Sequence, residues 1–333
     1  MYECEFHWPE GQHIAVVFNM SWETWTQDLG TSRNNQRPGE SVPPGAEYDR
    51  WMYPVYEHAY AETAGMQRLL DVWSRHEIQT SVYVSGLAVT LFPELARRVH
   101  SEGHEFIVQG WDHSFLWEQT VAEQTESIDK TTEALANLIG EAPAGYSASG
   151  GSITPESFDI IAERGFTYAC GFRNVDVPFI IKHHSGRDLV GMNSYAISDY
   201  DSYGMQDKTA RDVHQMWRDS LDALYAEGQR GSPQMLAFGT HPFLAHGFRT
   251  RPLEETIEYV KAKDNVWITT RGEIAEYMLR EYPDRQISDF FPEAVASDAY
   301  YGLSMGVGGE EARREALRHR KPAAPRELVD AGR

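Results

Sequence analysis

Cysteine is scarce in this sequence, since its 333 residues include only Cys4 and Cys170. Two cysteines can form at most one disulfide, which excludes a small fold held together by disulfides, and no closely spaced cysteine pair forms a zinc motif. Long apolar runs are missing as well. No stretch approaches the ~20 apolar residues that a membrane-spanning helix needs, so we expect no membrane partner.

Positive charge is also in deficit, because 30 Lys and Arg residues face 50 Asp and Glu residues, for a net charge of -20 at pH 7. Affinity for nucleic acids and for anionic lipids depends on basic residues that neutralise phosphate groups. We therefore expect no nucleic-acid partner and favour a small-molecule substrate. The N-terminus, MYECEFHWPEG, lacks the basic and then apolar pattern of a signal peptide, so we expect a cytoplasmic enzyme.

Short apolar runs alternate with helical patterns along most of the chain. The hydrophobic fraction of 41% is sufficient for a substantial core. Repeated alternation of strand and helix predicts a largely parallel sheet with helices outside it, either as a barrel or as an open sheet. The predicted strands span residues 13–18, 80–84, 105–109, 145–148, 166–170, 235–240 and 266–270.

Two irregular segments and a tail interrupt this pattern. Residues 26–57 are rich in Gly, Pro, Asn, Arg and Tyr, and a stretch of this length in a compact domain usually forms part of a site, so we expect it to contact the pocket or a neighbouring subunit. Residues 171–208 are irregular and rich in aromatic residues. Residues 308–333 are charged and poor in large apolar residues, which predicts a frayed helix or a disordered end. Residues 1–307 are expected to form one domain.

Polar residues with chemical potential follow several of the predicted strands. In parallel α/β folds the carboxyl ends of the strands meet at one edge, so residues far apart in the sequence are expected to converge there. The candidates are Asn19, Ser21 and Glu23 after the first strand, Gln109, Trp111 and His113 after the third, Ser147 after the fourth and His241 after the sixth.

The order of motifs resembles the polysaccharide deacetylase superfamily, also called family 4 carbohydrate esterases. Within it the sequence is most similar to the branch of allantoinase and related cyclic amide hydrolases. The motifs are VVFNMSWETW, GHEFIVQGWDH, GEAPAGYSASGGSITPESFDIIAERGFTY, VDVPF, HPFLAHG and NVWITTRGEIAEYM, and they span roughly residues 5–280. The resemblance implies a distorted (β/α) barrel of about seven parallel strands, and it implies a homo-oligomer.

The sequence departs from this family at the metal site. The family's two aspartates correspond to Asn19 and Ser21, its histidine pair corresponds to Gln109 and His113, and its arginine corresponds to Ser147. A catalytic zinc requires three protein ligands from Cys, His or carboxylate, and a neutral amide and a hydroxyl cannot balance the charge of the ion. We therefore expect no metal cofactor, and the alternative is a divalent metal such as zinc in a rebuilt set of ligands.

Without a metal, side chains must activate water and transfer protons. We assign this catalytic role to His113, His241 and Glu23, because histidine titrates near neutral pH and Glu23 is the carboxylate nearest to the first motif. The candidates for binding substrate are Asn19, Ser21, Gln109, Trp111 and Ser147.

Each assignment has a structural alternative. Asn19 or Ser21 alone is equally compatible with capping the following segment, and a lone carboxylate such as Glu23 is more often solvated on a loop. The side chain of Gln109 could instead be a buried amide whose hydrogen bonds are satisfied. The tryptophans are compatible with packing in the core or at the rim. His104 is expected to be structural. The adjacent histidines at 183 and 184 need not share a site.

The leading functional prediction is a metal-independent hydrolase of a C–N bond in a small, for example cyclic, amide, similar to allantoinase. The second candidate is a metal-dependent N-deacetylase of a sugar with a rebuilt metal site. Two further candidates are a catalytically silent binding protein on the same scaffold and an enzyme with non-hydrolytic chemistry. Retention of both His113 and His241 argues against the silent binding protein.

Overall fold

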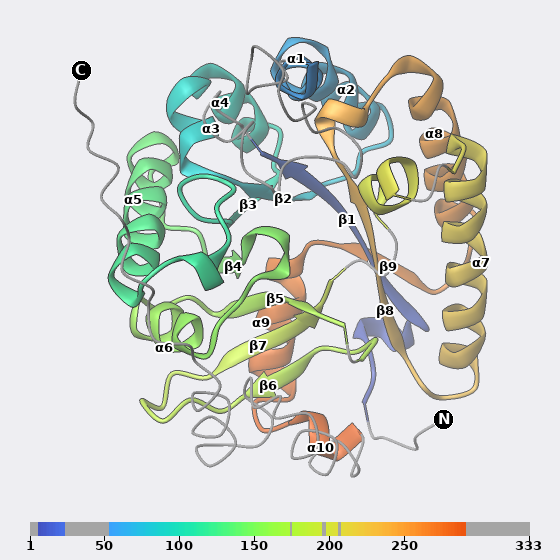
Figure 1. Cartoon of the computed structure of the whole chain (residues 1–333). Coiled ribbons are helices and arrows are strands. Elements are labelled where there is room, and N and C mark those ends of the chain that lie inside the picture. Colours follow the sequence, from blue (N-terminus) through green and yellow to red (C-terminus); the bar gives the residue numbers. More distant parts are fainter. Residues whose placement is uncertain (1–5, 24–52, 174, 195–197, 206–207, 291–333) are drawn as a thin grey trace.

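The structure, a computed structural model, describes residues 6–23, 53–173, 175–194, 198–205 and 208–290. At their centre lies one sheet of nine strands, surrounded by helices (Figure 1). The strands are β1 (Ile14–Trp22), β2 (Ser81–Val84), β3 (Glu105–Val108), β4 (Gly145–Ser147), β5 (Tyr168–Phe172), β6 (Phe179–Ile181), β7 (Leu189–Asn193), β8 (Gln234–Thr240) and β9 (Val266–Thr269). The helices are α1 (Tyr53–His58), α2 (Met66–Arg75), α3 (Gly86–Leu91), α4 (Pro93–Ser101), α5 (Val121–Ile139), α6 (Pro155–Glu163), α7 (Ala210–Gln229), α8 (Gly247–Lys261), α9 (Arg271–Glu281) and α10 (Ile287–Phe290).

The strands follow the order β6-β7-β5-β4-β3-β2-β1-β8 across the sheet, and β9 also pairs with β1. Paired strands run parallel, except that β6 is antiparallel to β7. One edge of β1 pairs with β8, and the other edge pairs first with β9 and then with β2. An isolated bridge between Ser198 and Gly239 connects β8 to the chain that follows β7. The fold is thus the predicted α/β class, a mostly parallel sheet with outer helices in the manner of a distorted barrel.

All seven predicted strands are present, but the prediction missed two others. Strands β6 and β7 lie within residues 171–208, which the sequence analysis treated as irregular. Each is only three to five residues long, and every residue in them is buried. A strand buried on both faces shows no alternation of polar and apolar residues, so such a short run carries little periodic signal.

Strand β1 is longer than predicted, and this changes the position of its polar residues. We placed its end at residue 18, before the first polar side chain, whereas the strand continues to Trp22 with all nine residues buried. Asn19 is tolerated inside because its hydrogen-bonding groups are satisfied. Its amide nitrogen donates to Phe238 O at 3.0 Å, and its oxygen accepts from Arg271 Nε at 2.8 Å.

Arg271, the first residue of α9, crosses the interior of the barrel. Its side chain is fully buried, and besides bonding to Asn19 it donates from Nη1 to the backbone oxygen of Asn193 on β7 at 2.8 Å. The start of α9 is held by Glu105, whose carboxylate accepts from the backbone nitrogens of Arg271 and Gly272. A carboxylate at this position compensates the unpaired N–H groups and the positive end of the helix. These contacts connect β1, β3, β7 and α9.

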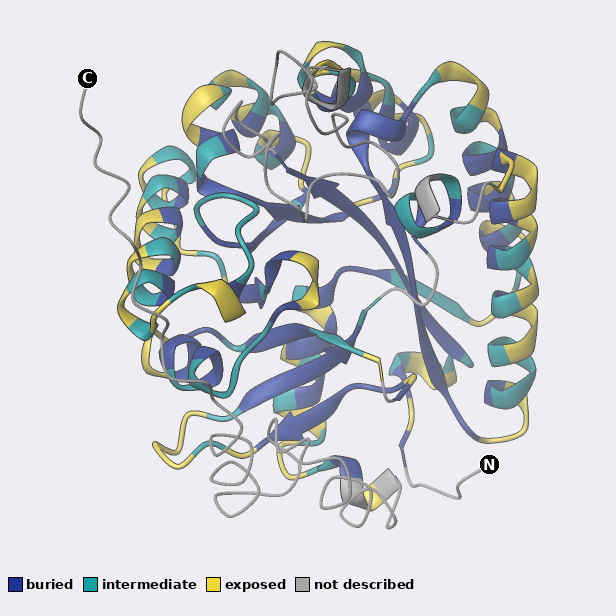
Figure 2. Cartoon of the chain, viewed as in Figure 1, coloured by how far each residue is buried: buried dark blue, intermediate teal, exposed yellow. Residues whose placement is uncertain are grey.

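Capping boxes begin four of the described helices. Thr120 caps α5, Thr209 caps α7 and Thr270 caps α9, each with an acidic residue three positions later, and Thr154 caps α6 together with Ser157. Each cap contributes about 0.5–2 kcal/mol to stability. Figure 2 shows that most strand residues are buried, with β9 mostly intermediate, while exposed residues are concentrated on the outer faces of the helices.

Several sequence-based predictions fall on residues outside the described part of the chain. Of the segment 26–57, the described part begins only at residue 53 with helix α1, and the tail 308–333 lies wholly outside it. Their predicted roles, and the extent of a single domain over residues 1–307, stay predictions. Among the described residues, no helix combines the length and the apolar character needed to cross a membrane.

Candidate functional site

A cavity of about 390 Å³ lies at the carboxyl ends of the parallel strands. The side chains in its wall come from loops that are distant in the sequence, because parallel strands deliver their following residues to the same end of a sheet. The loop after β1 contributes Glu23, the loop after β3 contributes Gln109 and His113, and the loop after β8 contributes His241. Ser147, at the end of β4, also lines the cavity. These five are predicted site residues, and the structure brings them together.

Glu23 lies at the centre of this group and is only 7% exposed. Its Oε1 is 3.2 Å from His113 Nε2 and 4.0 Å from His241 Nε2. Gln109 donates from Nε2 to the same oxygen at 3.4 Å. The alternative of a solvated carboxylate on a loop therefore does not describe Glu23, which is a buried anion between two imidazole rings.

The surroundings of Glu23 determine its charge. Burial by itself raises the pKa of Glu23, but the attraction and hydrogen bond of His113, together with His241 and His58, outweigh burial and lower the pKa to about 2. Glu23 is therefore ionised at neutral pH. A carboxylate with so low a pKa is a weak proton acceptor on its own, because general bases work best with a pKa near the operating pH. Its position suits the orientation and charge stabilisation of the two histidines.

His241 is held by Asp199, a residue that the sequence analysis did not identify. Asp199 Oδ1 lies 2.6 Å from His241 Nδ1, and its Oδ2 accepts from the backbone nitrogen of His241 at 2.8 Å. Both residues are buried. This contact fixes the ring so that Nε2 faces Glu23 and the cavity, which is the arrangement of an imidazole oriented by a carboxylate for proton transfer.

Asp199 also changes the proton affinity of His241. Burial lowers the pKa of His241, but the charge and hydrogen bond of Asp199, supported by Glu23 and Asp201, raise the pKa above its ordinary value. His241 is therefore suited to carry a proton at neutral pH and to donate it. No local motif marks Asp199, since it lies 42 residues before His241 and within the segment 171–208. The only feature of the sequence that points to Asp199 is the pair of aspartates in SDYDSY, which lies in a long segment predicted to be irregular.

Further side chains in the cavity wall were not predicted from the sequence. Those with large or polar side chains are Tyr83, Phe115, Arg173, Ser194, Ser198, Tyr200 and Asp201. Phe115 packs against Trp117 with a distance of 4.7 Å between ring centroids, and Trp117 is 61% exposed. Gly150 makes room for the Phe115 ring, because its φ is 56° and a Cβ there would lie 2.4 Å from the ring. Aromatic rings at the mouth of a cavity favour a substrate with a flat or apolar face.

Three predicted substrate-binding residues do not line the cavity. Asn19 and Ser21 lie within β1 and not after it, because the strand extends to Trp22, and Asn19 bonds within the barrel interior. Trp111 lies beside α5, where the ammonium of Lys130 is 3.5 Å from its ring centroid. The Trp111 ring therefore packs against the outer layer of helices. The prediction placed these residues by their distance from a strand end, which does not determine the direction of a side chain.

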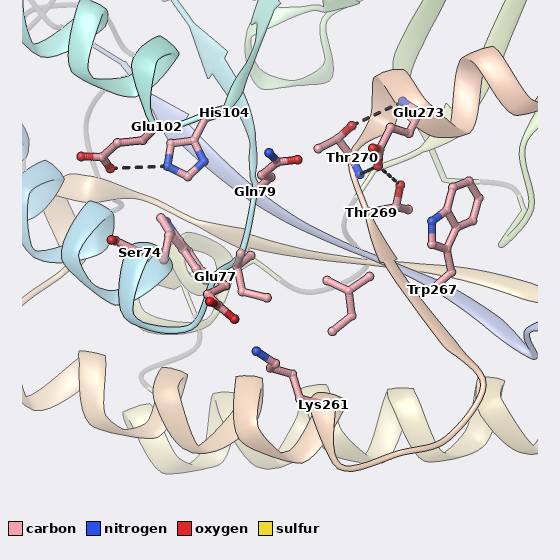
Figure 3. A pocket seen from close by; sticks show the side chains of 13 residues that line it. Ser74, Glu77, Gln79, Glu102, His104, Lys261, Trp267, Thr269, Thr270 and Glu273 are labelled. Atoms are coloured by element: carbon pink, nitrogen blue, oxygen red, sulfur yellow. Dashed lines mark hydrogen bonds and ion pairs between the residues drawn. The ribbon is translucent and has the colours of Figure 1, made fainter.

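His104 was expected to have a structural role, and its surroundings agree with this. This buried ring accepts from the backbone nitrogen of Thr80 at 3.0 Å and lies before β3, at the amino ends of the strands. A larger cavity of about 570 Å³ opens at that end. Figure 3 shows its ionisable side chains distributed around the wall, with His104 paired to Glu102 and Glu273 bonded to Thr269 and Thr270. Despite its size, this cavity lacks the convergence of histidines and carboxylates found around Glu23.

The residues around Glu23 include one carboxylate and two imidazoles, but as they are arranged their three ligand atoms do not all lie within 4.8 Å of one another. Among the described residues, one group brings three ligand atoms from His, Cys, Asp or Glu within 4.8 Å of one another, and it consists of Asp159, His183 and His184. Glu23, His113 and His241 are not such a group. Gln109, the next nearest donor, presents its amide nitrogen to Glu23, and an amide N–H does not bind a cation.

Comparison with known proteins finds similarity to polysaccharide deacetylases and to an allantoinase. A family model described as polysaccharide deacetylase matches residues 49–169. A curated peptidoglycan deacetylase of Helicobacter pylori is 21% identical over 266 residues, which cover 68% of this chain and 88% of that protein. The crystal structure of an allantoinase, PuuE, superposes with a TM-score of 0.73 and 25% identity, covering 83% of this chain and 94% of that one. A structure described as a probable polysaccharide deacetylase from Pseudomonas aeruginosa superposes with a TM-score of 0.74 and 24% identity, covering 84% and 95%.

Proposed function

The chain contains a polysaccharide deacetylase family domain and is a hydrolase of that superfamily, and from this premise we propose that it hydrolyses a C–N bond in a small amide without a metal cofactor. The observation that carries the proposal is the pairing of two histidines with two buried carboxylates. Glu23 contacts His113 and faces His241, while Asp199 holds the opposite nitrogen of His241.

Hydrolysis of an amide requires a group that takes a proton from water and a group that protonates the leaving nitrogen. In the proposed reaction the Glu23–His113 pair accepts the proton of the attacking water. His241, kept protonated by Asp199, donates a proton from Nε2 to the nitrogen as the C–N bond breaks. The proton on the pair then returns to solvent, and the deprotonated His241 takes up a proton. Each positioned group of this kind typically contributes ~10²–10⁴-fold to the rate.

The wall of the cavity supports a small and polar substrate. Its volume of about 390 Å³ lies in the range of sites for single small molecules. Phe115 and Tyr200 offer flat surfaces for a ring, and Arg173 together with Ser147 offers hydrogen-bond donors to carbonyl oxygens. These features favour a cyclic amide or ureide, and the solved allantoinase is a neighbour in structure. The cytoplasmic location and the homo-oligomer inferred from the sequence stay predictions.

A second candidate function is the removal of an N-acetyl group from a sugar. It is favoured by the relative named as a peptidoglycan deacetylase. This reaction also breaks a C–N bond, but it would release acetate. Hydrolysis of a cyclic amide releases no acetate. Phe115 in the cavity wall, backed by the exposed Trp117, is compatible with a sugar ring as well.

The two functions are separated by their products and by their response to chelation. The untagged protein is treated with a chelator and offered hydantoin, dihydrouracil and allantoin in one series, and N-acetylglucosamine oligomers in the other. We expect ring opening with an undiminished rate after chelation, and we expect no acetate. Acetate release that is lost on chelation and restored by zinc would replace our proposal by the second candidate. His7→Ala, at an exposed histidine outside the cavity, serves as the control for variants of His113 and His241.

A further inference from the structure

Two adjacent histidines and an aspartate meet on the side of the barrel formed by α6, β6 and β7. His183 and His184 follow β6 in the turn that leads to β7, and Asp159 lies on α6. His183 Nε2 is 3.1 Å from Asp159 Oδ1, and His184 Nδ1 is 4.0 Å from the same oxygen. The two imidazole rings lie side by side, with 4.1 Å between their centroids. The sequence alone did not require these histidines to share a site, but the fold brings them to one carboxylate.

The orientation of His183 is set by a second residue. Its Nδ1 lies 2.7 Å from Ser185 Oγ, and the backbone nitrogen of Ser185 also points to Nδ1 at 3.3 Å. This leaves Nε2 directed at Asp159, and the His183 side chain is only 7% exposed. With a metal on Nε2, Nδ1 would carry the ring proton and donate it to Ser185 Oγ, as the second ring nitrogen of metal-binding histidines usually does.

An ordinary hydrogen bond explains part of this arrangement but not all of it. A bond from His183 to Asp159 accounts for the first distance. It does not account for His184, whose side chain is 59% exposed and could extend into water, yet has Nδ1 directed toward the same oxygen. Ligand atoms around a tetrahedral zinc lie about 3.3 Å apart, given metal–ligand distances of ~2.0–2.1 Å. The 3.1 Å and 4.0 Å separations approach this spacing, and a small rotation of the exposed His184 would complete it.

We propose that Asp159, His183 and His184 form a binding site for a divalent transition metal of the zinc class. Two imidazoles and one carboxylate select Zn²⁺, Co²⁺, Ni²⁺ or Cu²⁺ over Mg²⁺ and Ca²⁺, which prefer oxygen ligands. Water fills the remaining coordination position on the exposed side. The ion connects α6 to the turn before β7, and it replaces the proton that His183 otherwise shares with Asp159.

The location makes this a structural site and not a catalytic one. Because β7 runs parallel to β5, the turn at its start lies at the amino ends of the strands. The cavity with Glu23 lies at their carboxyl ends. A metal found in the purified protein therefore need not occupy the catalytic cavity, and its removal should lower thermal stability without lowering hydrolytic activity.

The test uses the untagged full chain, stripped with a chelator and titrated with Co²⁺, whose visible absorption reports coordination by protein ligands. We expect one Co²⁺ per chain, displaced by Zn²⁺, and a rise in melting temperature on addition of either metal. Asp159→Asn and His184→Ala should each weaken Co²⁺ binding by about tenfold or more. His184 is exposed, so its replacement should leave folding intact, and His7→Ala provides the matched control at another exposed histidine.

A variant of the catalytic cavity distinguishes this site from a metal at Glu23. Glu23→Gln should bind Co²⁺ as the unaltered protein does. The inference is overturned if the unaltered protein binds no Co²⁺, or if Asp159→Asn and His184→Ala bind it with unchanged affinity. It is also overturned if Co²⁺ binding is lost in Glu23→Gln and retained in His184→Ala, since the ion would then lie in the catalytic cavity.

Discussion

Replacement of Asp199 by asparagine tests the proposed proton donor most directly. The change removes one negative charge at 2.6 Å from His241 Nδ1 and preserves the size of the side chain. Asparagine keeps one acceptor oxygen, so it can serve either the ring or the backbone nitrogen of His241 but not both. We expect the ring to lose its fixed orientation and much of its affinity for a proton.

The expected changes in kcat and KM follow from the catalytic contribution of His241 and from the position of Asp199 outside the cavity wall. A positioned acid or base typically contributes ~10²–10⁴-fold to the rate, so we expect kcat of Asp199→Asn to fall within that range. Asp199 does not line the cavity and does not contact substrate there, so KM should change little. A fall in kcat with an unchanged KM identifies an interaction that acts in the transition state.

The pH dependence of kcat gives a second test, because the direction of its expected shift is known. The pKa of His241 is raised above its ordinary value, mainly by Asp199 acting against burial. If His241 donates a proton, activity is present below this pKa and is lost as the pH rises through it. Asp199→Asn removes the main cause of the increase, so the loss of activity on the alkaline side should move to lower pH.

Steady-state kinetics from pH 5 to 10, with a melting curve for each variant, measures both effects. Asp219→Asn is the control, because it removes one negative charge at an exposed position on α7, outside the cavity. A much smaller change in kcat is expected there. The reasoning is refuted if Asp199→Asn folds normally and keeps both the kcat and the pH profile of the unaltered protein.

Three further replacements test the cavity and the barrel. Glu23→Gln should lower kcat by ~10²-fold or more. In the unaltered protein the low pKa of Glu23 contributes on the order of 3 kcal/mol to the free energy of unfolding above pH ~4.5, and this contribution is lost as the pH falls toward 2. Glu23→Gln should lack it, which unfolding curves measured as a function of pH will test. Arg271→Met should destabilise the fold by about 3 kcal/mol in urea unfolding, since Asn19 loses its partner in the interior, and a wild-type midpoint would contradict this. Gly150→Ala should raise KM more than it lowers kcat, because its Cβ displaces the Phe115 ring, and unchanged kinetics would show that the ring does not contact substrate.

The sequence alone determined the class of fold and most of the strands. Apolar runs of four to six residues between helical patterns can be recognised locally, so β1, β2, β3, β4, β5, β8 and β9 were predicted without knowledge of their pairing. It also located Glu23, Gln109, His113, Ser147 and His241 correctly at the carboxyl ends of strands, because the end of an apolar run is a local property. Their catalytic and binding roles stay predictions.

The tertiary structure decided which of these residues meet and what charge they carry. Asn19 and Ser21 follow an apolar run in the sequence, but pairing of β1 with β2 extends the strand past both of them. Asp199 reaches His241 only because the chain after β7 returns to β8, where Ser198 bridges to Gly239. The contact of Asp159 with His183 and His184 likewise depends on how α6 packs against the turn after β6. Such contacts join residues tens of positions apart, and the pKa of a buried group depends on distance and burial, neither of which is a local property of the chain.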